Sequence, residues 1–193
     1  MDIIKIASCS LADWPLLEEI ANAGKSVIFS TAGANQANID NMVSFFANRD
    51  VSATMMHCVG LYPTPYEQLN IGQIAYYKAR YPGLRIGYST HEDPSLTSTG
   101  GTAFCLGARV FEKHVALETD AYGKNAYSAS PENLSTWLNE LQQTVVSVGL
   151  MDAKVENTEA EAINVSPLID VVFILLIFFI VSATFVTLPG IEV

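Results

Sequence analysis

The chain has 193 residues, half of them hydrophobic, and a formal net charge of −10 that residues 1–150 and 151–193 share equally. This length leaves room for one medium-sized domain and a short appendage. An acidic surface repels phosphate backbones, so we expect no nucleic acid partner. The three cysteines lie far apart without a CxxC pair, so we expect reduced thiols rather than disulfides or a zinc site. The opening residues lack the basic region and long apolar run of a signal peptide.

Five short runs rich in β-forming residues recur along the first 150 residues. Several are apolar on consecutive residues, as strands buried on both faces of a sheet should be. The predicted strands are Ile3–Ser8, Ser26–Ser30, Ala53–Cys58, Leu84–Ser89 and Arg109–Val115.

Helical patterns lie between these strands and after the last one. Apolar residues at i, i+3, i+4 and i+7 predict one helix around residues 39–46 and another around 134–141. A shorter apolar face at 16–21 predicts a further helix with Gly24 as its C-cap. Repeated strand–helix units favour a parallel α/β sheet with right-handed crossovers.

Polar side chains gather where the predicted strands end. In a (β/α) barrel, catalytic groups sit at the carboxyl ends of the strands. Ser and His also favour strand-to-loop transitions, which would explain any one of them, but their presence at all five ends favours a site. These residues are Ser8, Ser30, His57, Ser89 with His91, and Glu112 with His114.

Two histidines follow neighbouring predicted strands. His91 and His114 could converge on one ion, since imidazole suits a divalent transition metal. Two ligands from the chain leave positions for water and a substrate oxygen, which is a catalytic rather than a structural arrangement. A lone histidine is more often structural, so this spacing alone leaves both interpretations open.

Three motifs give the first 150 residues a specific resemblance. They are HC-x-x-x-YPTPYE at 57–67, GYS-x-H at 87–91 and EKH at 112–114. With their order along the chain, they resemble the sialic acid synthase (NeuB) family. The resemblance implies condensation of phosphoenolpyruvate with the open aldehyde form of an N-acylated amino sugar, which gives a 2-keto sugar acid and inorganic phosphate.

The resemblance also implies roles for individual residues. His91 and His114 would be catalytic residues that hold Mn²⁺ or Mg²⁺, which polarises the sugar aldehyde as a Lewis acid. Glu112 would either orient a neighbour or buttress the barrel, and both interpretations stay open. Tyr62 would line the sugar site, with rigid loop packing between two prolines as its alternative. Further residues at family positions are the catalytic Lys5 and the substrate-binding Ser8, Ser30, Ser89 and Asn125.

The chain departs from the family pattern in two ways. Ser10 stands where the family has an acid, Thr90 where it has Asp, and Gly123-Lys124-Asn125 where it has G-P-D, which suggests a divergent branch. The fold class implied is a partial TIM barrel of about five β/α units, strands four to eight, without the C-terminal antifreeze-like domain. Five strands cannot close a barrel, so we expect little or no synthase activity from residues 1–150 alone.

A different kind of segment follows. Residues 167–188 carry one charge, Asp170, over 22 positions, which is roughly 33 Å of helix and enough to cross a bilayer. A buried core helix is the alternative, but the run is apolar on every face. Asp170 could be functional or a helix-terminal acid favoured by the dipole, and physical chemistry alone leaves this open.

The amino-acid sequence of this segment resembles the N-terminus of the ExbD/TolR family. Asn164, Pro167 and Asp170 match that family's Asn-x-Ser/Thr-Pro motif and its proton-carrying aspartate. The resemblance covers residues 151–193 and implies an acidic linker at 151–164, a transmembrane helix at 165–189 and a periplasmic start at 190–193. It further implies a single pass through a bacterial inner membrane, a cytoplasmic N-terminal part and a partner ring of ExbB/TolQ type.

Three readings of the whole chain therefore stand. The chain is a synthase fragment with a membrane anchor, an energy-transducing subunit with an N-terminal passenger, or a chimera with neither activity. The bare edges of an open sheet are an aggregation hazard. A homo-oligomer is a further expectation.

Overall fold

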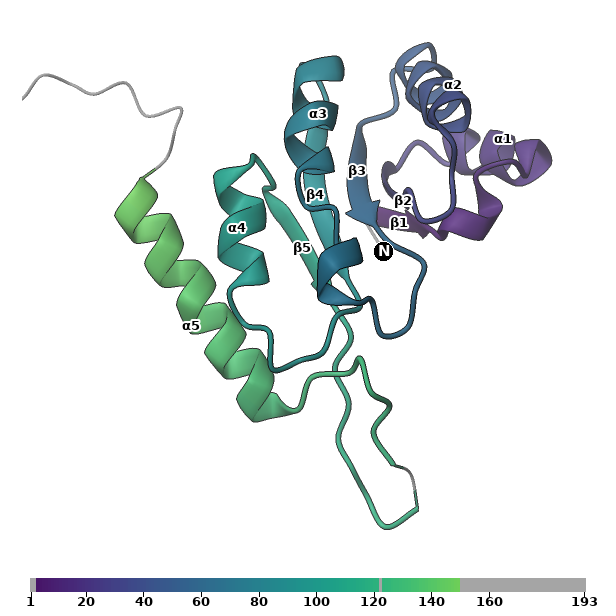
Figure 1. The fold of residues 1–193 in the computed structure, drawn as a ribbon. Helices are drawn as coiled ribbons and strands as arrows, with labels where there is room; N and C mark the ends of the chain where they lie inside the picture. The colour runs from purple at the N-terminus through teal and green to yellow at the C-terminus, as the bar shows by residue number, and fades with distance from the viewer. Residues whose placement is uncertain (1–2, 122, 150–193) are drawn as a thin grey trace, which may run out of the picture. The chain divides into compact units, whose positions relative to one another are not determined.

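Five parallel strands form one sheet in the computed structural model, which describes residues 3–121 and 123–149 (Figure 1). Their order in the sheet, β1-β2-β3-β4-β5, is their order along the chain. The prediction of a parallel α/β sheet is confirmed, and two predicted strands match to the residue. The strands are β1 (Ile3–Ile6), β2 (Ser26–Ser30), β3 (Ala53–Cys58), β4 (Arg85–Thr90) and β5 (Val110–Lys113).

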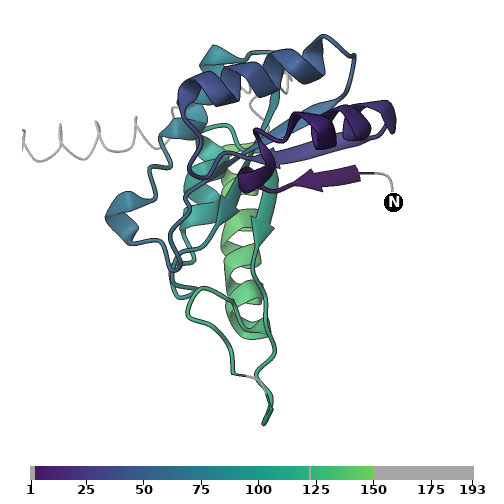
Figure 2. The same ribbon diagram turned by 90° about the vertical axis from the view of Figure 1, so that its right-hand side faces the viewer.

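A helix follows each strand. Trp14–Asn22 forms α1 after an Asp13 cap, and Gly24 comes just beyond its end at φ +62°. The other predicted helices are α2 (Gln36–Ala47) and α5 (Pro131–Val148), while α3 (Gln73–Arg80) and α4 (Thr99–Cys105) are helices that the apolar periodicity did not single out. Helices α1 and α2 lie on the same side of β1 and β2 (Figure 2). Short 3-10 turns at Ser8–Ser10 and Tyr66–Gln68 complete the elements.

The register of the strands separates the two faces of the sheet. One aligned row runs Ile6–Phe29–Met55–Ile86 across β1 to β4, and all four side chains are at most 2 % exposed in the main core under the helices. Burial of such a row removes a large apolar area from water and is the chief stabilising contribution to the fold. Alternation along each strand turns the neighbouring residues to the opposite, inner face.

The inner face is curved enough for the two edge strands to touch. Lys5 Nζ on β1 lies 2.6 Å from Glu112 Oε2 on β5, although three strands separate them in the sheet. A flat sheet with strands about 4.8 Å apart would hold its first and fifth strands roughly 19 Å apart. The five strands therefore form a half-barrel whose inner side chains meet across its axis, which agrees with a partial TIM barrel.

Helices α4 and α5 pack closely because α4 contains two glycines. A Cβ added to Gly100 would lie 2.6 Å from Cζ2 of Trp137, and one added to Gly101 would lie 2.6 Å from Oγ1 of Thr144. Trp137 forms a small second core with Phe104 and Leu141. The first turn of α5 is secured by a capping box between Ser130 and Asn133.

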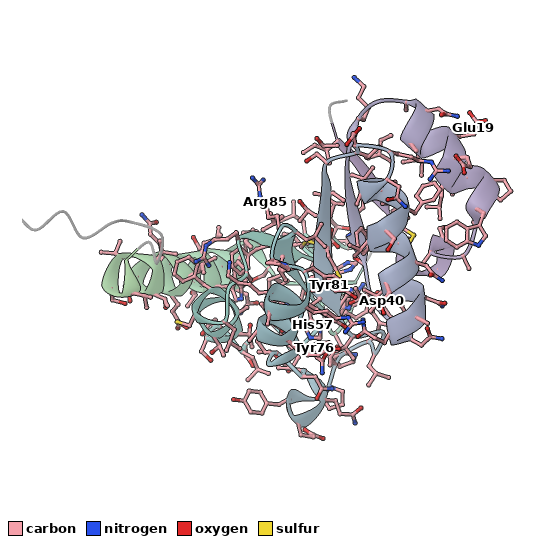
Figure 3. The ribbon with its side chains drawn as sticks, turned by 90° about the horizontal axis from the view of Figure 1, so that it is seen from above. Glu19, Asp40, His57, Tyr76, Tyr81 and Arg85 are labelled. Carbon is pink, nitrogen blue, oxygen red and sulfur yellow. The ribbon has the colours of Figure 1, made fainter. Side chains whose placement is uncertain are left out.

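An exposed polar cluster joins α2 to the end of α3. Asp40 accepts hydrogen bonds from Arg80 Nη2 at 2.7 Å, from Gln36 at 3.1 Å and from the Tyr81 hydroxyl. Figure 3 shows Asp40 and Tyr81 close together, whereas Arg85 points away from the rest of the molecule. The Arg80 hydrogen bond, aided by Tyr81, holds the pKa of the Asp40 carboxyl far below its usual range.

The predicted linker, transmembrane helix and periplasmic start at 151–164, 165–189 and 190–193 lie outside the described residues, and so does Asp170. Among residues 3–121 and 123–149, no helix has the length and apolar character to cross a bilayer. The free thiols of Cys9, Cys58 and Cys105 all lie in the described part of the chain.

Candidate functional site

Two imidazoles meet at the carboxyl ends of β4 and β5. The ring centroids of His91 and His114 lie 5.0 Å apart. Each histidine lies two residues after Ser89 or Glu112, so it points to the same face of the sheet. Ser89 and Glu112 pair across the two strands on the inner face. The predicted convergence of these two rings is thus seen, and the distance allows one small ion to contact both.

A hydrogen bond fixes the chemical form of His91. Its Nδ1 lies 3.0 Å from the carbonyl oxygen of Val59. A carbonyl can only accept, so Nδ1 carries the proton and Nε2 keeps a free lone pair. Burial lowers the pKa of His91, which favours the neutral imidazole that a metal ion requires.

A chain of polar contacts runs across the inner face below the histidines. Lys5 Nζ donates to Ser30 Oγ at 2.8 Å and to Glu112 Oε2 at 2.6 Å, and Ser89 Oγ donates to Glu112 Oε1 at 2.9 Å. Burial tends to raise the pKa of Glu112, but the hydrogen bonds from Lys5 and Ser89 outweigh it, so the pKa is lowered. The carboxylate thus holds the lysine of β1 and the serine of β4 in place across the inner face.

Aromatic rings surround the two histidines. Tyr62 lies with its ring centroid 4.4 Å from that of His91 and is 56 % exposed. Tyr127 stands nearly perpendicular to both imidazoles, at 5.1 Å from His114 and 6.1 Å from His91, and contacts Tyr62 at 5.2 Å. No periodicity or motif pointed to Tyr127, because it lies in an irregular loop after β5.

The remaining predicted residues lie around this centre. Ser8 begins the turn directly after β1 and is half-buried. Asn125 is exposed in the same loop as Tyr127, and its backbone carbonyl accepts from the Ser128 amide at 3.3 Å. Cys58, which the sequence did not single out, lies on the inner face with Sγ 3.8 Å from Nδ1 of His91, and burial raises the pKa of its thiol.

His57 is not part of this centre. Its ring stacks on Tyr88 at 6.1 Å on the helix-covered face of the sheet, and its Nε2 lies 2.9 Å from the carbonyl oxygen of Leu69. Burial lowers the pKa of His57. Its position at the end of a strand suggested a site residue, but strand alternation turns it to the other face.

The histidine pair fits a divalent ion in part. The free Nε2 of His91 and the neighbouring His114 ring supply two nitrogen ligands of a suitable kind. Within the described residues, no group of three or more His, Cys, Asp or Glu side chains could hold an ion. Two nitrogen ligands leave positions on such an ion for water or a substrate oxygen.

These features define a parallel β/α half-barrel with a polar centre at the carboxyl ends of its strands. A family model described as NeuB family matches residues 1–153, and the chain belongs to this family.

Curated relatives match the same region. An uncharacterized protein of Methanocaldococcus jannaschii is 37 % identical over 142 residues, which cover 72 % of this chain and 41 % of that protein. The N,N'-diacetyllegionaminic acid synthase of Campylobacter jejuni is 28 % identical over 169 residues, 86 % of this chain and 50 % of the enzyme. The chain spans half or less of the length of these relatives.

Solved structures of related proteins superpose on the half-barrel. A Chromobacterium violaceum protein assigned to spore coat polysaccharide biosynthesis superposes with a TM-score of 0.76 at 50 % identity, over 81 % of this chain and 47 % of that one. The sialic acid synthetase of Leptospira borgpetersenii gives a TM-score of 0.71 at 29 % identity, over 80 % and 53 % of the two chains. A second family model, described as biopolymer transport protein ExbD/TolR, matches residues 156–193.

Proposed function

We propose that residues 1–150 carry part of a sialic acid synthase-type site, in which phosphoenolpyruvate condenses with an N-acylated amino sugar. The observation that carries the proposal is the polar chain from Lys5 through Glu112 to Ser89, directly below the His91–His114 pair. Family membership supports it, and so do relatives named as synthases of neuraminic, legionaminic and pseudaminic acids.

Lys5 and three hydroxyls would bind phosphoenolpyruvate. Its phosphate and carboxylate need donors, and the ammonium of Lys5 lies 2.8 Å from Ser30 Oγ at the inner face. Ser8 lies just beyond the end of β1 and Ser89 just below His91. Glu112 pairs with the lysine at 2.6 Å and would hold its ammonium at the inner face, where the phosphoenolpyruvate anion would bind.

The sugar would lie above, against the histidines and tyrosines. A divalent ion held by His91 and His114 would act there as a Lewis acid on the sugar aldehyde. Tyr62 would line the sugar site, and Asn125 would reach it from the loop after β5. The new bond joins C3 of phosphoenolpyruvate to the aldehyde carbon, and water supplies the oxygen of the 2-keto group as phosphate leaves.

The site would be incomplete in residues 1–150. By resemblance, the five strands correspond to strands four to eight of a barrel, and five strands do not close one. We therefore expect the 193-residue chain to bind phosphoenolpyruvate but to turn it over slowly or not at all. Turnover with N-acetylmannosamine at an ordinary enzymatic rate would contradict the incompleteness.

Ligand binding tests the proposal directly. Titration of the full chain with phosphoenolpyruvate, followed by ³¹P NMR, should give saturable binding that Lys5→Met weakens about tenfold or more, because an ammonium contact is lost. Mn²⁺ binding, followed by water proton relaxation, should be lost on His91→Ala. Arg85→Met, at the opposite end of β4, is a control that should change neither. Equal phosphoenolpyruvate affinity of the Lys5 variant and the unaltered chain would rule out the assignment.

A second function is favoured by the ExbD/TolR match to residues 156–193. In this proposal, residues 165–189 form a single transmembrane helix in a bacterial inner membrane, with the half-barrel on the cytoplasmic side. Asp170 carries protons, since burial can bring a carboxyl pKa into the working range. The helix would sit in an ExbB/TolQ-type ring. Asp170→Asn should abolish proton-dependent activity of the reconstituted complex, and unchanged activity would remove the assignment.

A further inference from the structure

A buried ion pair lies directly behind the two histidines. Lys113 Nζ is 3.1 Å from Glu92 Oε1, and the two side chains are only 3 % and 0 % exposed. Glu92 follows His91 in the chain, and Lys113 precedes His114. Alternation turns the pair to the helix-covered face while the imidazoles face inward. The pair therefore connects the backbones that carry the two rings.

The two helices that cover this ion pair, α4 and α5, also contribute contacts. Helix α4 contacts the Glu92 carboxylate directly, and α5 contacts the residues that bind it. The hydroxyl of Thr99, in the first turn of α4, donates to Glu92 Oε1 at 2.7 Å. Trp137 of α5 donates from Nε1 to that hydroxyl at 3.3 Å, and Lys113 Nζ lies 5.7 Å from the centroid of the Trp137 ring. Thr99 and Lys113 thus contact Glu92 directly, and Trp137 contacts both of them, which restricts movement of the Glu92 carboxylate.

The backbone carbonyls next to Glu92 and Lys113 each bind a loop that carries one of the two site tyrosines. The carbonyl of His91 accepts from the Thr64 amide at 2.9 Å, two residues from Tyr62. The carbonyl of His114 accepts from the Ala129 amide at 2.8 Å, two residues from Tyr127. A shift of Glu92 would consequently move His91 and the loop of Tyr62. A shift of Lys113 would move His114 and the loop of Tyr127.

Stability alone is a poor reason for such a pair. Two buried charges lose hydration, and replacement by apolar residues is often neutral or stabilising. Here the free-energy cost of burying the carboxylate is higher, since Glu92 Oε2 has no hydrogen-bond partner within the described residues. What the ion pair does provide is a fixed distance between the chain segments that carry His91 and His114.

We propose that Glu92 and Lys113 are positioning residues that set the spacing and orientation of the His91 and His114 imidazoles. The inference rests on the proposed function only in taking these imidazoles as the ion site.

The test separates stability from positioning in the full chain, kept in mild detergent because of its apolar segment. Lys113→Met leaves a buried carboxylate unpaired and should lower the free energy of unfolding, whereas Glu92→Leu with Lys113→Met should largely restore it. In the double variant, Co²⁺ affinity should still be about tenfold or more below that of the unaltered chain, as for lost outer-shell contacts. A purely structural pair would restore both quantities together.

A second measurement does not depend on a metal. With ¹⁵N-labelled histidine, ring-to-ring NOEs between His91 and His114 should weaken in the double variant, while the signals of His57, on the other face, stay unchanged. Arg49→Met, which breaks the exposed pair with Glu18, is the matched control and should alter nothing.

The outcomes are distinct. A double variant that regains stability with unchanged ring NOEs and Co²⁺ affinity overturns the inference. If the unaltered chain binds no Co²⁺, the ion site of the proposed function fails, and the NOEs alone decide the positioning. If the double variant does not fold, Thr99→Val, which removes one contact to Glu92, must weaken the same NOEs. Unchanged NOEs in that variant also overturn the inference.

Discussion

Replacement of Gly87 by alanine tests whether the inner face of the half-barrel is as tightly filled as the structure indicates. A Cβ at this position of β4 would lie 2.3 Å from Sδ and 2.8 Å from Cε of Met56, and 2.6 Å from the carbonyl oxygen of Val110. Met56 is fully buried, and the Val110 carbonyl belongs to the neighbouring strand β5, so neither moves freely. Overpacking of this kind costs about 1–3 kcal/mol.

A smaller effect opposes this cost. Alanine restricts the unfolded chain more than glycine does, which contributes about 0.4–1 kcal/mol in favour of the variant. We expect a net loss of about 1–2 kcal/mol in the free energy of unfolding, measured by urea denaturation. Gly83→Ala is the control, since no atom lies within 4 Å of its added Cβ, and it should be neutral or slightly stabilising. A Gly87→Ala protein as stable as the control would refute the packing described for the inner face.

Two further predictions concern the outer elements. Because the Arg80 hydrogen bond lowers the pKa of Asp40, the contribution of Asp40 to stability is complete above its ordinary pKa of about 3.9 and is lost as the pH falls below it. Asp40→Asn should therefore reduce the acid sensitivity of the urea midpoint, and an unchanged pH profile would contradict this. Ser130→Ala removes the acceptor for the Asn133 amide at 3.2 Å and should cost about 1 kcal/mol of unfolding free energy, with Ser147→Ala at the other end of α5 as a near-neutral control.

The sequence alone was sufficient for the sheet and for much of the site's composition. Ser26–Ser30 and Ala53–Cys58 are predicted to the residue. The apolar core Val27–Phe29 lies between polar residues, which leaves few alternatives for the first of these strands. The order of strands and helices favours a parallel sheet, and parallel strands bring their carboxyl ends to one edge. His91, His114, Ser89 and Glu112 could be grouped for that reason.

Other helices depended on tertiary contacts. The sequence of α4 contains Gly100 and Gly101, which are poor helix formers, yet these are the residues that let α5 approach. Propensity argues against this helix, and only its packing against Trp137 explains it. Helix α3 has only eight residues, of which Ile74 and Tyr77 are buried, so its apolar periodicity is short and weak.

The face of each side chain and the contacts between distant segments were decided by the tertiary structure. His57 has the same strand-end position as the site residues but the opposite parity, and this depends on a register that no single strand reveals. Tyr127 reaches the histidines only because an irregular loop returns over β5, and Glu92 meets Lys113 only because β4 and β5 are neighbours. Local sequence specifies periodicity and chemical type, whereas such pairings depend on the free energy of the whole packed chain.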